Sequence, residues 1–119
     1  MRVMVIVKAT ANSEAGELPT PELMAAMGAF NQKLMAAGVM LDGGGLKPTK
    51  LGARVAFDGE TRTVVPGPFG ATRELVSGFW IWKVASLEEA IDWVKQCPNP
   101  MPVPSEIEIR PLYEMEDFA

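Results

Sequence analysis

Histidine is absent from this chain of 119 residues, and cysteine occurs once, as Cys97. Without histidine the chain lacks the most common general base and the most common metal ligand. A single cysteine excludes an internal disulfide and metal sites built on paired cysteines. The glycine run 43–45 lacks the spacing and the following residues of a nucleotide-binding loop. We therefore expect neither a metal nor a cofactor.

A basic excess and a long apolar run are missing as well. Lysine and arginine number 11 against 15 acidic residues, which gives a formal charge of -4. Nucleic acids and anionic membranes attract basic surfaces, so neither is predicted as a partner. No stretch approaches the roughly 20 apolar residues of a membrane helix, and the apolar start of the chain is short for a signal peptide. We expect a cytoplasmic protein.

Hydrophobic residues, by contrast, make up 48% of the chain, which is ample for a packed core. The length fits one domain, so a single domain is predicted over residues 1–119. Within it, the acidic tail 114–119 is predicted to be mobile.

The first half of the chain predicts a strand followed by a helix. Residues 3–7 form a short apolar run rich in β-branched side chains, which is typical of a buried strand. Thr20 is a good helix N-cap, and Pro21 suits the first helical position. Gly38 is placed to end this helix.

The second half predicts a hairpin, a strand and another helix. Asp58-Gly59 between two β-like runs is a strong hairpin signal. Residues 77–84 are rich in aromatic side chains, as expected of a central strand. Ser86 and Glu89 have the spacing of a capping box, which starts the second helix.

Residues 105–110 alternate polar and apolar side chains, which is the pattern of a last, half-buried strand. The order is then strand, helix, several strands, helix, strand. It predicts the α+β class and a ferredoxin-like βαβ…βαβ fold with an antiparallel sheet.

The central strand 77–84 is apolar on both faces, because Trp80 and Trp82 alternate with Phe79 and Ile81. Two helices cover one face of a sheet only. The other face is most simply covered by the sheet of a second subunit. We therefore expect a two-fold homodimer that forms a dimeric α+β barrel.

One loop carries a recognisable motif. Gly67-Pro68-Phe69, followed by Thr72-Arg73-Glu74 and Gly78-Phe79, resembles the signature of the YCII-related proteins. In particular it resembles the branch named for an Asp-Gly-Pro-Phe (DGPF) motif. The first strand, the Gly44–Pro48 turn, the Asp58-Gly59 hairpin and the last strand fit the same family.

The resemblance implies a dimeric α+β barrel with pockets near the barrel mouth. It also implies a possible accessory role beside a sigma-factor-type transcription regulator, since many members occur next to such factors. Here, however, Pro66 and Ala71 stand at positions that are usually acidic in the motif. The histidine–aspartate pair of some relatives cannot form either. Binding is therefore expected ahead of catalysis.

Five residues are the candidates for a ligand pocket: Asp42, Phe69, Arg73, Glu74 and Trp80. Arg73 is a candidate donor to an anion or carbonyl, beside Glu74. Each has a structural alternative as well. The motif is also typical of a rigid turn, Asp42 of a turn residue, Arg73 and Glu74 of a surface ion pair, and Trp80 of core packing.

Three functions follow from these candidates. The first is a homodimeric protein that binds a small molecule. The second is a lyase or dehydrochlorinase-like enzyme, with Asp42 or Glu74 as the base and Arg73 as the electrostatic stabiliser. The third is an accessory partner of a transcription regulator, which uses a surface and no pocket.

Overall fold

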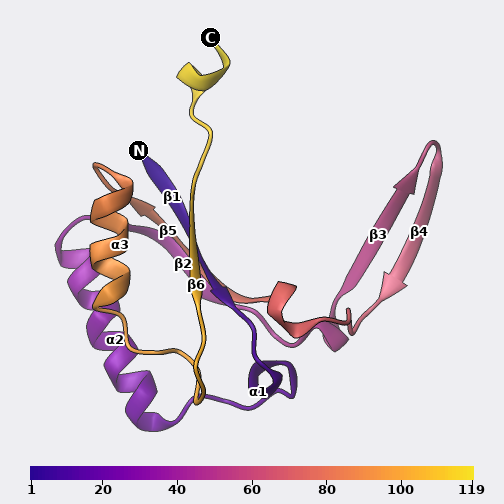
Figure 1. The fold of residues 1–119 in the computed structure, drawn as a ribbon, viewed down its shortest axis with the longest axis horizontal. Coiled ribbons are helices and arrows are strands. Elements are labelled where there is room, and N and C mark those ends of the chain that lie inside the picture. Colours follow the sequence, from indigo (N-terminus) through magenta and orange to yellow (C-terminus); the bar gives the residue numbers. More distant parts are fainter.

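The computed structural model describes residues 1–119, apart from the side chain of Arg73. Its centre is a four-stranded antiparallel sheet with the strand order β2-β5-β1-β6 (Figure 1). The strands are β1 (Arg2–Lys8), β2 (Met40–Gly45), β5 (Val76–Lys83) and β6 (Ile107–Pro111). The first strand of each half lies in the middle of this sheet. This is the ferredoxin-like arrangement, so the predicted fold class is confirmed.

Two longer helices connect the strands. Helix α2 (Pro21–Ala36) leads from β1 to β2, and α3 (Leu87–Lys95) leads from β5 to β6. The sequence does not predict the short helix α1 (Ala11–Glu14) or three single turns of 3-10 helix. These turns are η1 (Thr49–Leu51), η2 (Thr72–Glu74) and η3 (Met115–Phe118). None of the described helices is both long and apolar enough to cross a membrane.

The predicted helix starts are confirmed by their hydrogen bonds. The Thr20 hydroxyl accepts from the Leu23 backbone N–H at 3.1 Å. The Ser86 hydroxyl accepts from the Glu89 N–H at 3.2 Å. The Glu89 carboxylate accepts from the N–H of Ala85, one residue before the cap, at 2.9 Å. These contacts satisfy backbone donors that would otherwise lack a partner at the helix starts.

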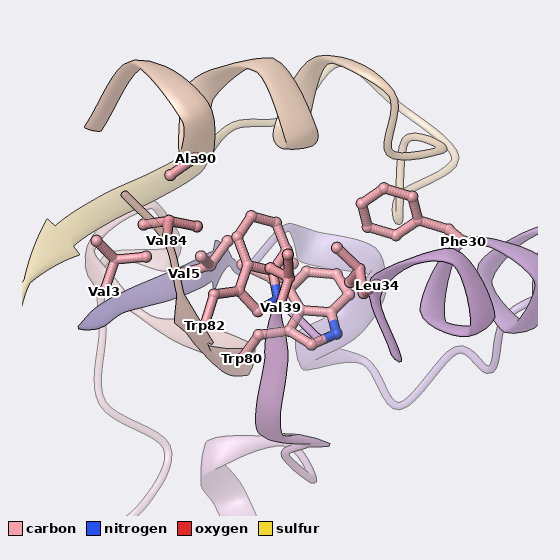
Figure 2. Close-up of a cluster of buried hydrophobic side chains, with 10 residues drawn as sticks. Val3, Val5, Phe30, Leu34, Val39, Trp80, Trp82, Val84 and Ala90 are labelled. Carbon is pink, nitrogen blue, oxygen red and sulfur yellow. The ribbon is translucent and has the colours of Figure 1, made fainter. Parts of the chain in front are cut away.

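The core lies between the sheet and the two helices (Figure 2). Trp82 is fully buried, and its ring centroid lies 5.7 Å from that of Trp80. The Phe30 ring of α2 contacts both indoles edge-on, with distances between ring centroids of 6.0 Å to Trp80 and 6.3 Å to Trp82. Such edge-on pairs add to the stabilisation from burial alone. Met24 and Met35 of α2 are exposed and take no part in this core.

The opposite face of the sheet carries a second apolar row. Met4 pairs with Ile81, and Ile6 pairs with Phe79, all on the side away from Trp80 and Trp82. These four side chains are half-buried and stand outside the core cluster of the described residues. We call them the outer sheet face. Its composition is the one that the strand pattern predicts.

The predicted hairpin consists of β3 (Ala53–Asp58) and β4 (Thr61–Pro66) and turns at Gly59, whose φ is +57°. It projects away from the rest of the chain (Figure 1), and every residue of its two strands is exposed. The whole chain is accordingly flat, with extents of 46 × 45 × 19 Å. Its radius of gyration of 16.2 Å exceeds the roughly 13.5 Å of a compact domain of this length.

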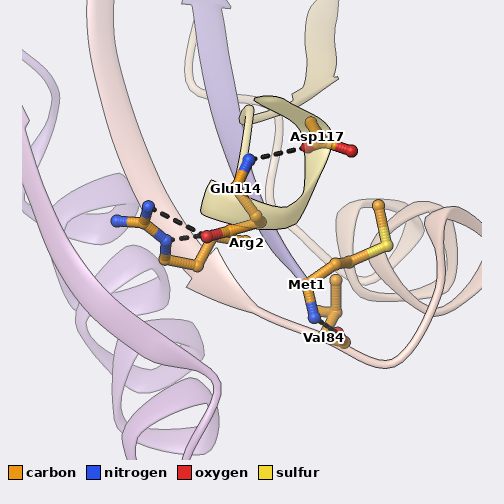
Figure 3. A network of polar contacts seen from close by, with 5 residues as sticks. All are labelled: Met1, Arg2, Val84, Glu114 and Asp117. Atoms are coloured by element: carbon orange, nitrogen blue, oxygen red, sulfur yellow. Dashed lines mark hydrogen bonds and ion pairs between the residues drawn. The ribbon is translucent and has the colours of Figure 1, made fainter. Parts of the chain in front are cut away.

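The C-terminal tail is tied to the first strand (Figure 3). The Arg2 guanidinium donates to both Glu114 carboxylate oxygens, at 3.0 and 3.2 Å. The Glu114 N–H donates to the Asp117 carboxylate at 2.7 Å. The hydrogen bonds and charge of Arg2 lower the pKa of the Glu114 carboxyl. The mobility predicted for residues 114–119 stays a prediction.

Candidate ligand-binding cavity

A cavity of about 830 Å³ opens at one end of the helix-covered sheet face. It lies between the first turns of α2, the α1 segment, the ends of β2 and β5, and the loop 99–102. Its size is within the range of roughly 300–1,000 Å³ typical of small-molecule sites. Its larger apolar lining residues are Leu18, Leu23, Met24, Met27, Met40, Leu46, Phe79, Trp80 and Met101.

Glycines in the sheet create this space. Gly45 pairs with Gly78 on the face that looks toward α2, so neither strand places a side chain there. A Cβ atom on Gly45 would meet no atom within 4 Å. Gly43 lies two residues earlier on β2 and pairs with Trp80. A Cβ atom on Gly43 would lie only 2.8 Å from Cδ1 of Trp80. Glycine at 43 therefore lets the indole lie over the strand, and glycine at 45 and 78 leaves the floor of the cavity open.

Trp80 forms a fixed wall of the cavity. Its side chain is 7% exposed, and its Nε1–H donates to Oδ1 of Asn31 on α2 at 2.9 Å. The edge-on contact with Phe30 holds the other side of the ring. A buried indole whose N–H already has a partner offers its apolar surface to a ligand.

The polar groups of the lining are mostly engaged with one another or with backbone. Asn12 donates to the Glu17 carboxylate at 2.8 Å, and Asn99 accepts from the Met101 N–H at 3.0 Å. Among the described lining residues, the titratable ones are Glu17 and Lys47. The cavity is thus equipped to bind by apolar burial, with one cation, Lys47, and one carboxylate, Glu17, in its described lining.

The structure places the other predicted site residues elsewhere. Asp42 is exposed, pairs with Ile81 on the outer sheet face, and accepts from the Gly43 N–H at 2.8 Å. Glu74 is exposed on η2, and the Arg73 side chain lies outside the described residues. Of the five candidates, Trp80 is the one found among the described lining residues of this cavity.

Phe69 of the motif packs at the base of the hairpin. Its N–H donates to Oγ1 of Thr49 at 3.3 Å, and the Arg54 guanidinium lies 4.2 Å from its ring centre. Thr49 Oγ1 in turn donates to the Glu14 carboxylate at 2.6 Å. These residues connect the motif loop to α1 and to β3.

Gly67 explains why the motif needs a glycine. A Cβ atom at this position would overlap the carbonyl group of Thr49. The Gly67 N–H also donates to the Gly52 carbonyl at 3.0 Å, which closes the base of the hairpin. The peptide bond from Gly67 to Pro68 is cis. These contacts favour the interpretation of the motif as a rigid turn.

Cys97 carries no signature of a nucleophile. Burial raises the pKa of its thiol to about 11. The thiol donates to the Pro98 carbonyl at 3.2 Å. Both effects favour the protonated thiol, whereas the thiolate is the reactive form.

The sequence analysis missed Asn31, Gly45 and Gly78 as parts of a site. The signal that could have found the glycines is their place inside strand patterns, where glycine often marks a close approach or an open space. Asn31 lies on α2 next to the buried residues Phe30 and Leu34, and nothing local in the sequence links it to Trp80.

Two comparisons with known proteins bear on this chain. The family model of the YCII-related domain matches residues 1–116. A protein of Rhizobium meliloti (strain 1021) named Uncharacterized protein R00369 is 32% identical to this chain over 90 residues. That stretch is 76% of this chain and 73% of the relative. The family match spans the sheet, the helices and the motif loop.

Proposed function

Because this chain belongs to the YCII-related family, whose relative named above is uncharacterised, we propose its function from its geometry. We propose a homodimeric protein that binds a small, largely apolar molecule in the cavity beside Trp80. The observation that carries the binding proposal is the open, glycine-floored cavity with its fixed aromatic wall.

Three properties of the cavity support binding. Its walls are mainly apolar, so a ligand would gain free energy by leaving water. The hydrogen bond from Trp80 to Asn31 fixes the wall before a ligand arrives, which lowers the entropy cost of binding. Lys47 in the lining suits a ligand with an anionic or carbonyl end.

The substitution Gly45→Val tests the site without threatening the fold. It places a side chain into the open cavity, and valine suits a strand. With 1-anilinonaphthalene-8-sulfonate as the probe, we expect the dissociation constant to rise by about tenfold or more, because the apolar volume is filled. Fluorescence titration measures binding, and thermal unfolding reports stability.

Ala56→Val is the control. It places the same valine side chain on an exposed strand of the hairpin, away from the residues that line the cavity. Probe binding should stay at the wild-type level in this variant. Equal binding by Gly45→Val and wild type, or no saturable binding by wild type, contradicts the proposed site.

The dimer proposal is supported by the outer sheet face. Met4, Ile6, Phe79 and Ile81 form a row of half-buried apolar side chains there. The chain exposes 8073 Å², about 1,800 Å² more than a compact monomer of this mass. Packing two outer sheet faces together would form the dimeric α+β barrel. Asp42, opposite Ile81 in the register, would then lie between the two sheets.

Ile81→Lys tests this interface. A lysine there would lose water on dimerisation, so the dimer dissociation constant should rise by about tenfold or more. Gln32→Lys, on an exposed position of α2, is the control and should leave the dimer unchanged. Light scattering after size exclusion gives the mass. A monomeric wild type at micromolar concentration contradicts the dimer.

A further inference from the structure

The β3–β4 hairpin is a second exposed surface, and its strands lie outside the core of the described residues. We propose that it is an arm whose apolar face packs on a second copy of the chain, and that the motif loop fixes the direction of this arm. The proposal deepens the dimer proposed above, but it rests on the residues of the hairpin itself.

The two faces of the hairpin differ in composition. Val55 pairs with Val64, and Phe57 pairs with Arg62, so these side chains share one face. The exposed fractions are 48% for Val55, 73% for Phe57 and 66% for Val64. The Arg62 guanidinium lies over the Phe57 ring, 4.5 Å from its centre, and donates to the Gly59 carbonyl at the turn at 2.8 Å. The opposite face carries Arg54, Ala56, Asp58, Thr61, Thr63 and Val65.

A hairpin of this kind does not stand alone in water. An isolated two-stranded ribbon is marginally stable, and it needs a third strand or a packed face for independent stability. Within the described chain, all twelve residues of β3 and β4 are exposed, and none belongs to the core cluster. The apolar face therefore calls for a surface from outside the chain.

The exposed area indicates that this surface is a second copy. A standard interface removes about 800 Å² from each partner. Contact through the outer sheet face at that size accounts for less than half of the roughly 1,800 Å² by which this chain exceeds a compact monomer. The arm supplies further apolar area. Two-fold symmetry makes its contact reciprocal, so both arms are covered in one closed dimer.

Contacts at the base of the hairpin fix the direction in which the arm points. Arg54 lies on the face of β3 opposite to Phe57, and its guanidinium lies over the ring of Phe69 in the motif. The Phe69 N–H donates a hydrogen bond to Thr49. Glu14 of α1 accepts from both the N–H and the hydroxyl of Thr49, at 3.1 and 2.6 Å. Gly67 closes the base by its bond to Gly52. An arm fixed before association loses less entropy when it binds.

Phe57→Glu tests the arm in the full-length protein. A carboxylate on the apolar face should raise the dimer dissociation constant by about tenfold or more, because it must be desolvated in the contact. Thr63→Glu places the same charge on the opposite face of the same hairpin and should leave dimerisation unchanged. Analytical ultracentrifugation measures both. The near-ultraviolet circular dichroism of Trp80 and Trp82, which lie in the core, verifies folding.

A photo-reactive phenylalanine analogue at Val64 gives a second measurement. We expect a crosslink between two chains, identified by mass spectrometry of the joined peptides, and no such crosslink from position 63. A dimer dissociation constant that is unchanged in Phe57→Glu would contradict the proposal that the arm packs on a second copy. Crosslinks that form only within one chain would contradict it as well. If Phe57→Glu weakens the dimer while Ile81→Lys does not, the arm stands and the sheet-face interface is rejected. The opposite result rejects the arm and keeps the sheet face.

Discussion

Among the glycines, Gly67 is the one at which an added Cβ atom would meet its closest neighbour. Its position leaves no room for a Cβ atom beside the Thr49 carbonyl. Gly67→Ala must therefore displace backbone at the base of the hairpin. We expect it to lower the free energy of unfolding by about 1–3 kcal/mol, the usual cost of overpacking. Urea denaturation followed by tryptophan fluorescence measures the change.

Gly28→Ala is the matched control for this prediction. Gly28 lies inside α2, is exposed, and has no atom within 4 Å of an added Cβ. Alanine should stabilise the helix there by about 0.5–1 kcal/mol, since glycine is a poor helix former. A Gly67→Ala variant with an unchanged urea midpoint would contradict the steric role assigned to Gly67.

At the residue scale the sequence predicted what depends on neighbours a few positions away. Thr20 and Ser86 cap their helices by bonds to the third residue along the chain. The role of Gly67 could not be predicted this way, because its neighbour Thr49 is 18 positions earlier. The same holds for the cavity. Trp80 could be singled out as an aromatic residue, but its partner Asn31 is 49 positions away.

At the scale of elements, the strand β2 shows where local patterns mislead. Three consecutive glycines are not typical of the interior of a strand, yet residues 43–45 all lie in β2 and pair with β5. The neighbouring strand β5 supplies the reason, because Trp80 needs a glycine opposite it. The hairpin was predicted correctly from Asp58-Gly59, but its projection from the body depends on the contacts of Phe69 and Thr49.

The tie between β1 and the tail predicts a pH dependence. Arg2 lowers the pKa of Glu114 below its ordinary value of 4.5. Because the pKa of Glu114 is lower in the folded chain, its contact with Arg2 stabilises the fold at pH values above 4.5. This contribution is lost as the pH falls through the lowered pKa of the folded chain. We expect Arg2→Ala to move the Glu114 pKa back toward 4.5, measured by NMR titration of the carboxyl carbon.

Lys33→Ala, at an exposed position of α2, is the control variant, because it removes a charge but leaves the contact between Arg2 and Glu114 in place. The pKa of Glu114 should stay lowered in this variant. The stability difference between wild type and Arg2→Ala should shrink as the pH falls below 4.5. A Glu114 pKa that is the same in both proteins would show that the bidentate contact is absent in solution.

At the scale of the whole molecule, the chain is too flat and too exposed for its mass. The outer sheet face and the apolar face of the arm lie on different strands, and both stand outside the core cluster of the described residues. Composition and alternation could predict the first surface, because both faces of one strand are apolar. They could not predict the second, because a hairpin pattern does not say whether the hairpin folds back on its own domain.

If both surfaces are buried in a dimer, the melting temperature must depend on protein concentration. Unfolding then releases two chains, so each tenfold rise in concentration stabilises the dimer by about 1.4 kcal/mol. For two chains of 119 residues unfolding together, this corresponds to about 3 °C per tenfold. Scanning calorimetry over a hundredfold range resolves such a shift. The double variant Phe57→Glu, Ile81→Lys should melt lower and at a constant temperature, because it has lost both contacts. A wild-type melting temperature that stays constant over this range would mean that the chain folds and unfolds alone, with both apolar surfaces facing water.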